Sequence, residues 1–140
     1  MAPSARQAAA RAGEGDSVIG WKLDREQRKE LLQQFPPRYG NPDADHVTLR
    51  TEAAEDAELP DEILGEIVGR ADDGQGVEAM AVAIGGATDR PGGGTYHITW
   101  SLGLGRKAQE SNDVLAAGGW TAFDLPMPVK LIPSCWPRKA

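Results

Sequence analysis

The sequence predicts an α+β domain in which antiparallel strands predominate and two main helices are inserted between them. Three observations support this fold class. Short runs of alternating apolar and polar residues recur along the chain, as expected of half-buried strands. Glycine and proline clusters separate these runs at hairpin-like intervals. Only two stretches after residue 16 combine helical spacing with start and stop signals. With 140 residues, 40% of them hydrophobic and 26% charged, the chain is long enough for one domain with a substantial core.

The first half of the domain predicts a strand, a helix and a second strand. Residues 17–23 alternate and form the first strand. Asp24 is placed to cap a helix, with Gln27 as the partner three residues on, and the helix ends near Gln34 because Pro36 and Pro37 follow. Residues 45–51 form the next strand, and the acidic stretch 52–60 forms a loop.

The second half predicts mainly strands, with one further helix. The run 63–68 fits a helix by its spacing and a strand by its glycines and β-branched residues. We favour a strand because 72–76 resembles a hairpin turn leading into a strand over 77–84. The remaining predictions are a mobile glycine-rich loop over 85–94, a strand over 95–102, a helix over 107–117 and extended chain over 120–132, where Pro126 and Pro128 are typical of edge strands.

Both histidines of the chain begin the same four-residue pattern. His46-Val47-Thr48-Leu49 and His97-Ile98-Thr99-Trp100 each read histidine, apolar, threonine, apolar, and they lie 51 positions apart. In a strand, each histidine shares one face with its threonine while the apolar pair occupies the other face. Imidazole is the natural acid or base near neutral pH, and hydroxyl groups donate to oxyanions. The duplicated pattern therefore predicts a two-histidine acid–base site, with two ordinary half-buried strand histidines as the alternative.

Two such HxTx motifs resemble the signature of the 2H phosphoesterase superfamily. The second motif continues into Ser101, as in the extended form of the signature. The approach to the first motif, from Gly20-Trp21-Lys22-Leu23 through Phe35-Pro36-Pro37, is similar to small stand-alone 2H domains associated with RNA repair and to the cyclic phosphodiesterase module of tRNA ligases. The likeness extends over roughly residues 17–137, and its specific part is the nine motif residues. The separation of the histidines is shorter than in many members.

The resemblance implies a two-lobed domain in which the two HxT strands face each other across a central cleft. It implies hydrolysis of 2′,3′-cyclic phosphates by His46 and His97 as general acid and base, with Thr48, Thr99 and, more weakly, Ser101 on the phosphate oxygens, and with no metal and no cofactor. By analogy, His97 is the base and His46 the acid. The expected partners are a nucleotide or an RNA terminus with a cyclic phosphate, and RNA-repair proteins.

Several further side chains are candidates for supporting roles. Lys22, Arg38 and Arg50 are the cations nearest the first motif, and each either neutralises phosphate charge or is a solvated surface residue. Tyr39 is a candidate for stacking on a nucleobase. The single cysteine, Cys135, excludes an intrachain disulfide and a zinc–cysteine cluster.

Charge and the N-terminal segment limit the remaining choices. The net charge is −6, and twelve of the 21 acids lie between positions 41 and 80, which argues against binding of an extended duplex. Residues 1–16 read as a flexible tail before a single domain over 17–140. No apolar run suggests a membrane span or a signal peptide, so we expect a cytoplasmic protein. The alternative to an enzyme is a binding module that recognises an RNA end or a cyclic nucleotide in the same cleft.

Overall fold

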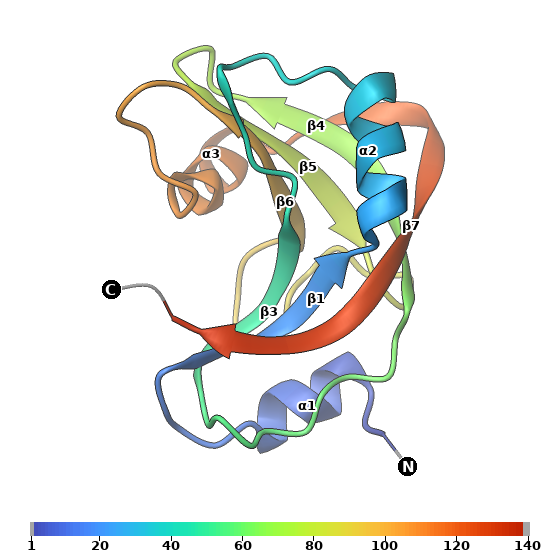
Figure 1. The fold of residues 1–140 in the computed structure, drawn as a ribbon, viewed down its shortest axis with the longest axis vertical. Helices are drawn as coiled ribbons and strands as arrows, with labels where there is room; N and C mark the ends of the chain where they lie inside the picture. The colour runs from blue at the N-terminus through green and yellow to red at the C-terminus, as the bar shows by residue number, and fades with distance from the viewer. Residues whose placement is uncertain (1, 139–140) are drawn as a thin grey trace.

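The fold is an α+β domain built on one antiparallel sheet, as the sequence predicts (Figure 1). It is taken from a computed structural model, which describes residues 2–138. In chain order the elements are α1 (Ala5–Arg11), β1 (Ser17–Leu23), α2 (Arg25–Gln34), β2 (Asn41–Pro42), β3 (His46–Ala53), β4 (Leu64–Asp72), β5 (Val77–Ala83), β6 (His97–Leu102), α3 (Glu110–Gly118) and β7 (Thr121–Pro137).

The seven strands follow the order β2-β6-β5-β4-β7-β1-β3, and the sheet is strongly curled (Figure 1). Strand β7 makes the corner, because its first part pairs with β4 while residues 131–137 pair with β1. Each half of β7 therefore has one strand neighbour, which makes room for its prolines. The side-chain amide of Gln27 in α2 forms hydrogen bonds with the backbone of the first half of β7, on the edge that no strand covers. Its nitrogen donates to the Pro128 carbonyl at 3.0 Å and its oxygen accepts from the Lys130 amide at 2.6 Å.

The chain from residue 41 to residue 53 joins the two ends of the curled sheet. Strand β2 pairs with β6, and the next two residues continue that ladder, since the Asp43 and Ala44 amides donate to the Trp100 and Thr99 carbonyls at 2.9 and 2.8 Å. At Ala44 the backbone has a φ of +48°, a left-handed conformation that bends the chain away from β6. Strand β3 then pairs with β1. The two HxT strands meet at this bend.

The apolar faces of the curled sheet enclose the main core. Trp21 and Trp100 are the largest fully buried side chains, and each indole nitrogen has a carbonyl partner, Glu62 at 2.8 Å and Phe35 at 2.9 Å. A buried tryptophan removes about 150–250 Å² from water, which at roughly 25 cal/mol per Å² contributes about 4–6 kcal/mol. The alternation predicted for both motifs is confirmed, because the apolar residue after each histidine and after each threonine lies in this core. They are Val47, Leu49, Ile98 and Trp100.

Most local predictions match the structure. Asp24 caps α2 by accepting from the Gln27 amide at 3.0 Å, and Leu31 on its inner side is buried. Residues 64–68 of the run predicted as a strand over 63–68 lie in strand β4, which is followed by the expected turn at 72–76. Residues 85–94 form a loop with two isolated bridges. The second helix begins at Glu110, three residues later than expected.

The N-terminal segment differs from the expected flexible tail. Residues 5–11 form helix α1, which begins with a reciprocal capping box between Ser4 and Gln7. One face of this helix packs into the main core with its alanines, which are Ala5, Ala8, Ala9 and, just after the helix, Ala12. The folded domain therefore begins near residue 4.

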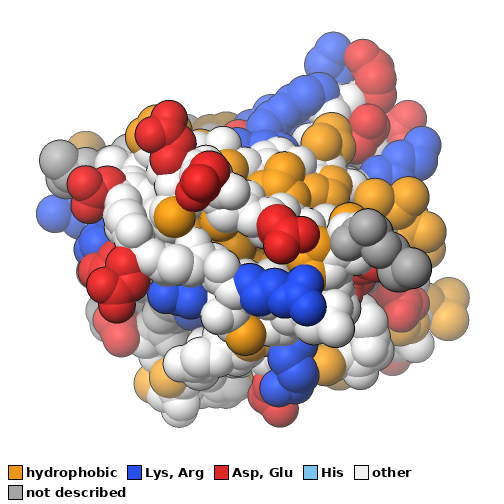
Figure 2. All heavy atoms as spheres, turned by 90° about the horizontal axis from the view of Figure 1, so that it is seen from below, with side chains coloured by type: hydrophobic (Ala, Val, Ile, Leu, Met, Phe, Trp, Pro, Cys, Tyr) orange, Lys and Arg blue, Asp and Glu red, His pale blue; other side chains and the backbone are white. Residues whose placement is uncertain are grey.

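The end of the molecule at which α1 lies has mixed character (Figure 2). Acidic and basic side chains are interspersed there around a hydrophobic patch. Among the residues that the structure describes, no helix is long and apolar enough to cross a membrane.

Candidate functional site

Backbone pairing with β6 brings the two histidines near one another. The Ala44 amide donates to the Thr99 carbonyl at 2.8 Å, and His46 and His97 each lie two residues along the chain from this contact. The side chains of His46 and His97 lie on the face opposite the core. They are close enough that charge on His46 helps to lower the pKa of His97. The first residues of β3 and β6, which are the two histidines, therefore lie near one another at the bend of the chain at Ala44.

His46 is held by the carboxylate that precedes it. The Nδ1 atom lies 3.0 Å from Asp45 Oδ2, and the same carboxylate pairs with Lys22 at 2.6 Å and Arg25 at 2.9 Å. Burial raises the pKa of Asp45, but hydrogen bonds from these three side chains outweigh it and hold that pKa well below its usual range. An ionised Asp45 accepts the Nδ1 proton, which leaves Nε2 for chemistry and gives protonated His46 an ion-pair partner. The ring is also 4.9 Å from Trp136, edge to face.

His97 has a different environment. Its residue surface is only 8% exposed, and Nδ1 lies 2.8 Å from the Thr95 carbonyl oxygen. A carbonyl only accepts, so Nδ1 carries a proton and Nε2 has the lone pair. Burial is the main cause that lowers the pKa of His97; the charges of Arg90 and His46 add to it and outweigh the opposing hydrogen bond. His97 is therefore neutral near pH 7.

The two threonines are not equivalent. Thr48 is half-buried and lines a pocket of about 500 Å³, which neither His46 nor His97 lines. Thr99 is buried. Its hydroxyl lies 2.9 Å from the hydroxyl of Ser111, in the first turn of α3, and 3.3 Å from the carbonyl of Ala108, just before that helix. Thr48 is thus the motif hydroxyl that faces open space.

Three predicted residues are engaged elsewhere. Ser101 is fully buried, donates to Glu78 at 2.6 Å and accepts from the Tyr39 amide at 3.2 Å, so we remove it from the phosphate contacts. Arg38 and the Tyr39 hydroxyl both bond to Asp72, where the β4–β5 hairpin turns. Ser101 lies four residues, about 13 Å, along β6 from His97, which takes this cluster away from the imidazoles. The structure therefore places Arg38 and Tyr39 at this hairpin and not beside the imidazoles.

Lys22 and Arg50 do lie near the first motif. Lys22 pairs with Asp45, and its ammonium is 4.4 Å from the centre of the Trp136 ring, so it acts on His46 through that carboxylate. Arg50 lines the pocket and donates to the carbonyls of Ala9 at 2.6 Å and Gly13 at 2.9 Å. Arg50 thereby ties β3 to helix α1.

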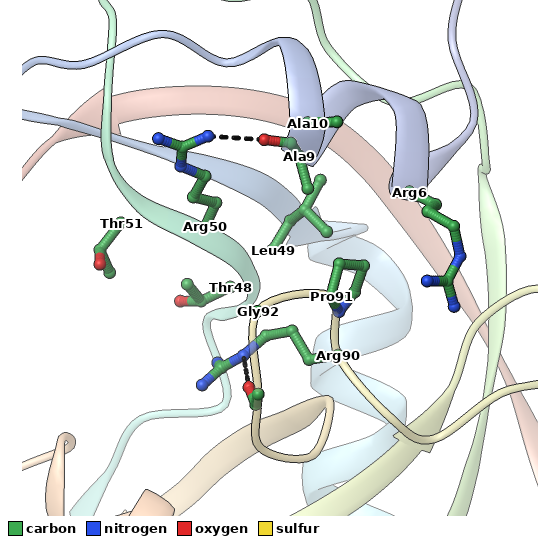
Figure 3. A pocket seen from close by; sticks show the side chains of 11 residues that line it. Arg6, Ala9, Ala10, Thr48, Leu49, Arg50, Thr51, Arg90, Pro91 and Gly92 are labelled. Atoms are coloured by element: carbon green, nitrogen blue, oxygen red, sulfur yellow. Dashed lines mark hydrogen bonds between the residues drawn. The ribbon is translucent and has the colours of Figure 1, made fainter.

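Arg90 is a site residue that the motif analysis missed. It lies on the glycine-rich loop before β6, and Figure 3 shows its guanidinium beside Thr48. Nε donates to the Gly93 carbonyl at 3.1 Å and a terminal nitrogen donates to Asn112 at 3.1 Å, both neutral acceptors. Burial lowers the pKa of Arg90, and its charge acts on His97. The only sequence signal was a basic residue seven positions before the second histidine, which spacing alone does not single out.

The comparisons with known proteins add no identification, because no family model, no curated protein and no solved structure matches the chain. Within residues 2–138, no three His, Cys, Asp or Glu side chains are grouped so that they would hold a metal ion.

Proposed function

We propose that this protein is a metal-independent phosphodiesterase that opens 2′,3′-cyclic phosphates of nucleotides or RNA ends by two-histidine acid–base catalysis. The observation that carries the proposal is the juxtaposition of His46 and His97, each with Nδ1 hydrogen-bonded and Nε2 available. This is the arrangement expected for groups that act on opposite sides of a phosphorus atom.

The environments of the two histidines support distinct roles. His97 is buried and neutral, so its Nε2 accepts a proton from water while the water oxygen attacks phosphorus. The bond between phosphorus and one ribose oxygen breaks, and protonated His46, paired with Asp45, donates its Nε2 proton to that leaving oxygen. The reaction consumes one water and leaves a phosphomonoester with the two imidazoles in exchanged protonation states. A proton transfer through solvent restores them.

Charge that develops on the nonbridging oxygens needs donors fixed in advance. The Thr48 hydroxyl and the Arg90 guanidinium lie together on the pocket wall and supply them (Figure 3). Thr99 is the weaker candidate for a phosphate contact, because its hydroxyl is already bonded to Ser111 and Ala108. Each catalytic histidine is expected to contribute about 10²–10⁴ in rate.

Turnover of adenosine 2′,3′-cyclic phosphate and of a short RNA ending in a cyclic phosphate tests the proposal. The assay contains excess EDTA and compares the wild type with His46→Ala and His97→Ala. Each variant should lose at least about a hundredfold in kcat, and the double variant little more than either single one. Trp136→Phe, which alters a neighbour of His46 but not a proton-transferring group, serves as the control.

Retention of wild-type turnover by either histidine variant would contradict the mechanism. Binding of the cyclic phosphate with no turnover by the wild type would replace it with a binding module. Activity abolished by EDTA and restored by a divalent cation would remove the metal-independent assignment.

A further inference from the structure

The pocket lined by Thr48 contains more positive charge than one phosphodiester needs. Arg6, Arg50 and Arg90 all line it, although the chain has more acids than bases and a net charge of −6. Among the described residues, none of the three has a carboxylate partner within 4.0 Å, whereas Lys22, Arg25, Lys29, Arg38, Arg70, Arg106 and Arg138 are all ion-paired. Cations without carboxylate partners around a concave site favour the binding of an anionic ligand.

The three arginines are held in different ways around the same space. Arg50 is fixed by two backbone carbonyls of the α1 segment, and Arg90 by one carbonyl and one amide oxygen, so all their acceptors are neutral. Arg6 is exposed on α1 and lies on the opposite side of Pro91 from Thr48 (Figure 3). The charges of Arg6 and Arg90 both lower the pKa of Tyr96, so both guanidinium groups lie in the region of its hydroxyl.

One carboxylate shares this region. Glu62 also acts on Tyr96, but its Oε2 accepts from the Ala5 amide at the start of α1 at 3.1 Å, and it forms no ion pair with Arg6 or Arg90 within 4.0 Å. The charge of the arginines therefore remains available at the pocket.

Strand geometry relates this charge to the histidines. His46 and Thr48 lie two residues apart on β3, a step of about 7 Å, and Arg50 follows after a shift in the pairing with β1 at Leu49. That step is comparable with the separation of neighbouring phosphates in an extended nucleotide chain. The floor between the arginines is apolar, formed in part by Leu49 and Pro91, and the volume of about 500 Å³ lies in the range of small-molecule sites.

We propose that this pocket binds a second phosphate group of the substrate, one nucleotide unit from the phosphodiester held at the histidines. The inference rests on the proposed function, because it takes the reacting phosphate to lie between His46 and His97. The second phosphate is the 5′-phosphate of a mononucleotide or the internucleotide phosphate of an RNA end. Arg6 and Arg50 take the oxygens of the second phosphate, Arg90 stays with Thr48 at the reacting phosphate, and the ribose packs on the apolar floor.

Calorimetric titration of the full chain at low ionic strength tests the second-phosphate site without requiring turnover. The ligands are adenosine 3′-monophosphate and adenosine 3′,5′-bisphosphate, and the quantity compared is the ratio of their dissociation constants. In the wild type the bisphosphate should bind at least about tenfold more tightly, because it gains charge-assisted contacts with arginine. Arg6→Gln and Arg50→Gln should each reduce this ratio about threefold or more.

Arg11→Gln is the matched control, since Arg11 is an exposed arginine of the same helix that does not line the pocket. It should leave the ratio unchanged. An equal loss in Arg11→Gln would mean that only the general charge of the molecule matters, and a wild-type ratio near one would mean that no such site exists; either result overturns the inference.

A dinucleotide identifies the source of the second phosphate. If adenylyl-(3′,5′)-adenosine 3′-phosphate shows the arginine-dependent preference more strongly than the bisphosphate, the site serves an RNA end; the reverse indicates a mononucleotide. A strong preference for either ligand with no hydrolysis of any cyclic phosphate would support the second-phosphate site and contradict the phosphodiesterase proposal. Hydrolysis of a cyclic phosphate with no such preference would support the phosphodiesterase proposal and contradict the second-phosphate site.

Discussion

Arg28 connects helix α2 to the segment that brings the two motifs together, and its replacement should damage both stability and catalysis. Its Nε atom donates to the Ala44 carbonyl at 2.9 Å and a terminal nitrogen donates to the Asp43 carbonyl at 2.7 Å. The amides of the same two residues donate to the backbone of the second motif. Arg28 therefore fixes the bend at which β3 leaves β6, and with it the position of His46.

The expected effect of Arg28→Met follows from these two bonds. A hydrogen bond from a charged donor is worth about 1.5–3 kcal/mol. Because Arg28 is half-buried, water replaces part of what is lost, and we expect a loss of about 2–3 kcal/mol in the free energy of unfolding. At about 2–4 °C per kcal/mol for a chain of this size, Tm should fall by about 5–10 °C. A shift of His46 by even about 1 Å should lower kcat/KM about ten- to a hundredfold.

The assay combines thermal unfolding with turnover of adenosine 2′,3′-cyclic phosphate. Lys29→Met is the matched control, because Lys29 is the next residue of α2, its side chain is 71% exposed and its ion pair with Glu26 is long at 3.9 Å. It should change Tm by less than about 2 °C, as most surface substitutions do. The reasoning fails if Arg28→Met leaves Tm unchanged, or if Tm falls while kcat/KM stays at the wild-type value.

Three further perturbations address the histidines and the strand that supports them. Asp45→Asn removes the carboxylate that orients His46 and should lower kcat about ten- to a hundredfold; an unchanged kcat in a pH series would refute this role. Folding lowers the pKa of His97 below its usual value near 6.5, so the unfolded state binds more protons and stability should fall as pH drops below about 6.5. Urea unfolding at pH 7.5 and 5.5 measures this, and His97→Gln should reduce the difference; an equal difference in the variant would rule out His97 as its source. In Gly20→Ala the new Cβ would collide with the Val47 carbonyl oxygen across β1 and β3, so Tm should fall by about 10 °C or more; near-wild-type unfolding would contradict the close pairing.

The local patterns of the sequence predict most of this fold, because they depend on neighbours in the chain. Alternation assigns the faces of both motifs correctly, and the Asp24–Gln27 pair starts α2 where expected. Helix α1 also had a signal. Its buried alanines follow the spacing i, i+3, i+4 and i+7, and Ser4 with Gln7 forms a capping box. Alanine gives such a face little hydrophobic contrast, which explains why the segment reads as a tail.

The site residues that sequence reasoning misplaced all depend on long-range contacts. Ser101 shares the polar face of β6 with His97, but the buried Glu78 of the neighbouring strand takes its hydroxyl. Arg38 is near the first motif in sequence, yet Asp72 holds it at a distant hairpin. Arg90 reaches the site only because its loop folds back beside Thr48 (Figure 3). No periodicity within one strand contains this information.

Arg90 should also change the basicity of His97 during the catalytic cycle, which predicts a difference between two pH profiles. In the free protein, the positive charge of Arg90 helps to lower the pKa of His97 and keeps the base neutral. A bound phosphodiester anion offsets that charge and adds its own attraction for a proton, so the pKa of His97 should rise in the complex. The acidic limb of kcat, which reports the complex, should therefore lie at higher pH than that of kcat/KM, which reports the free protein. Arg90→Gln should move both limbs to higher pH, because the charge of Arg90 acts on His97 in the free protein and in the complex. If both limbs coincide in the wild type, or if the variant moves neither, the charge of Arg90 does not act on the catalytic base.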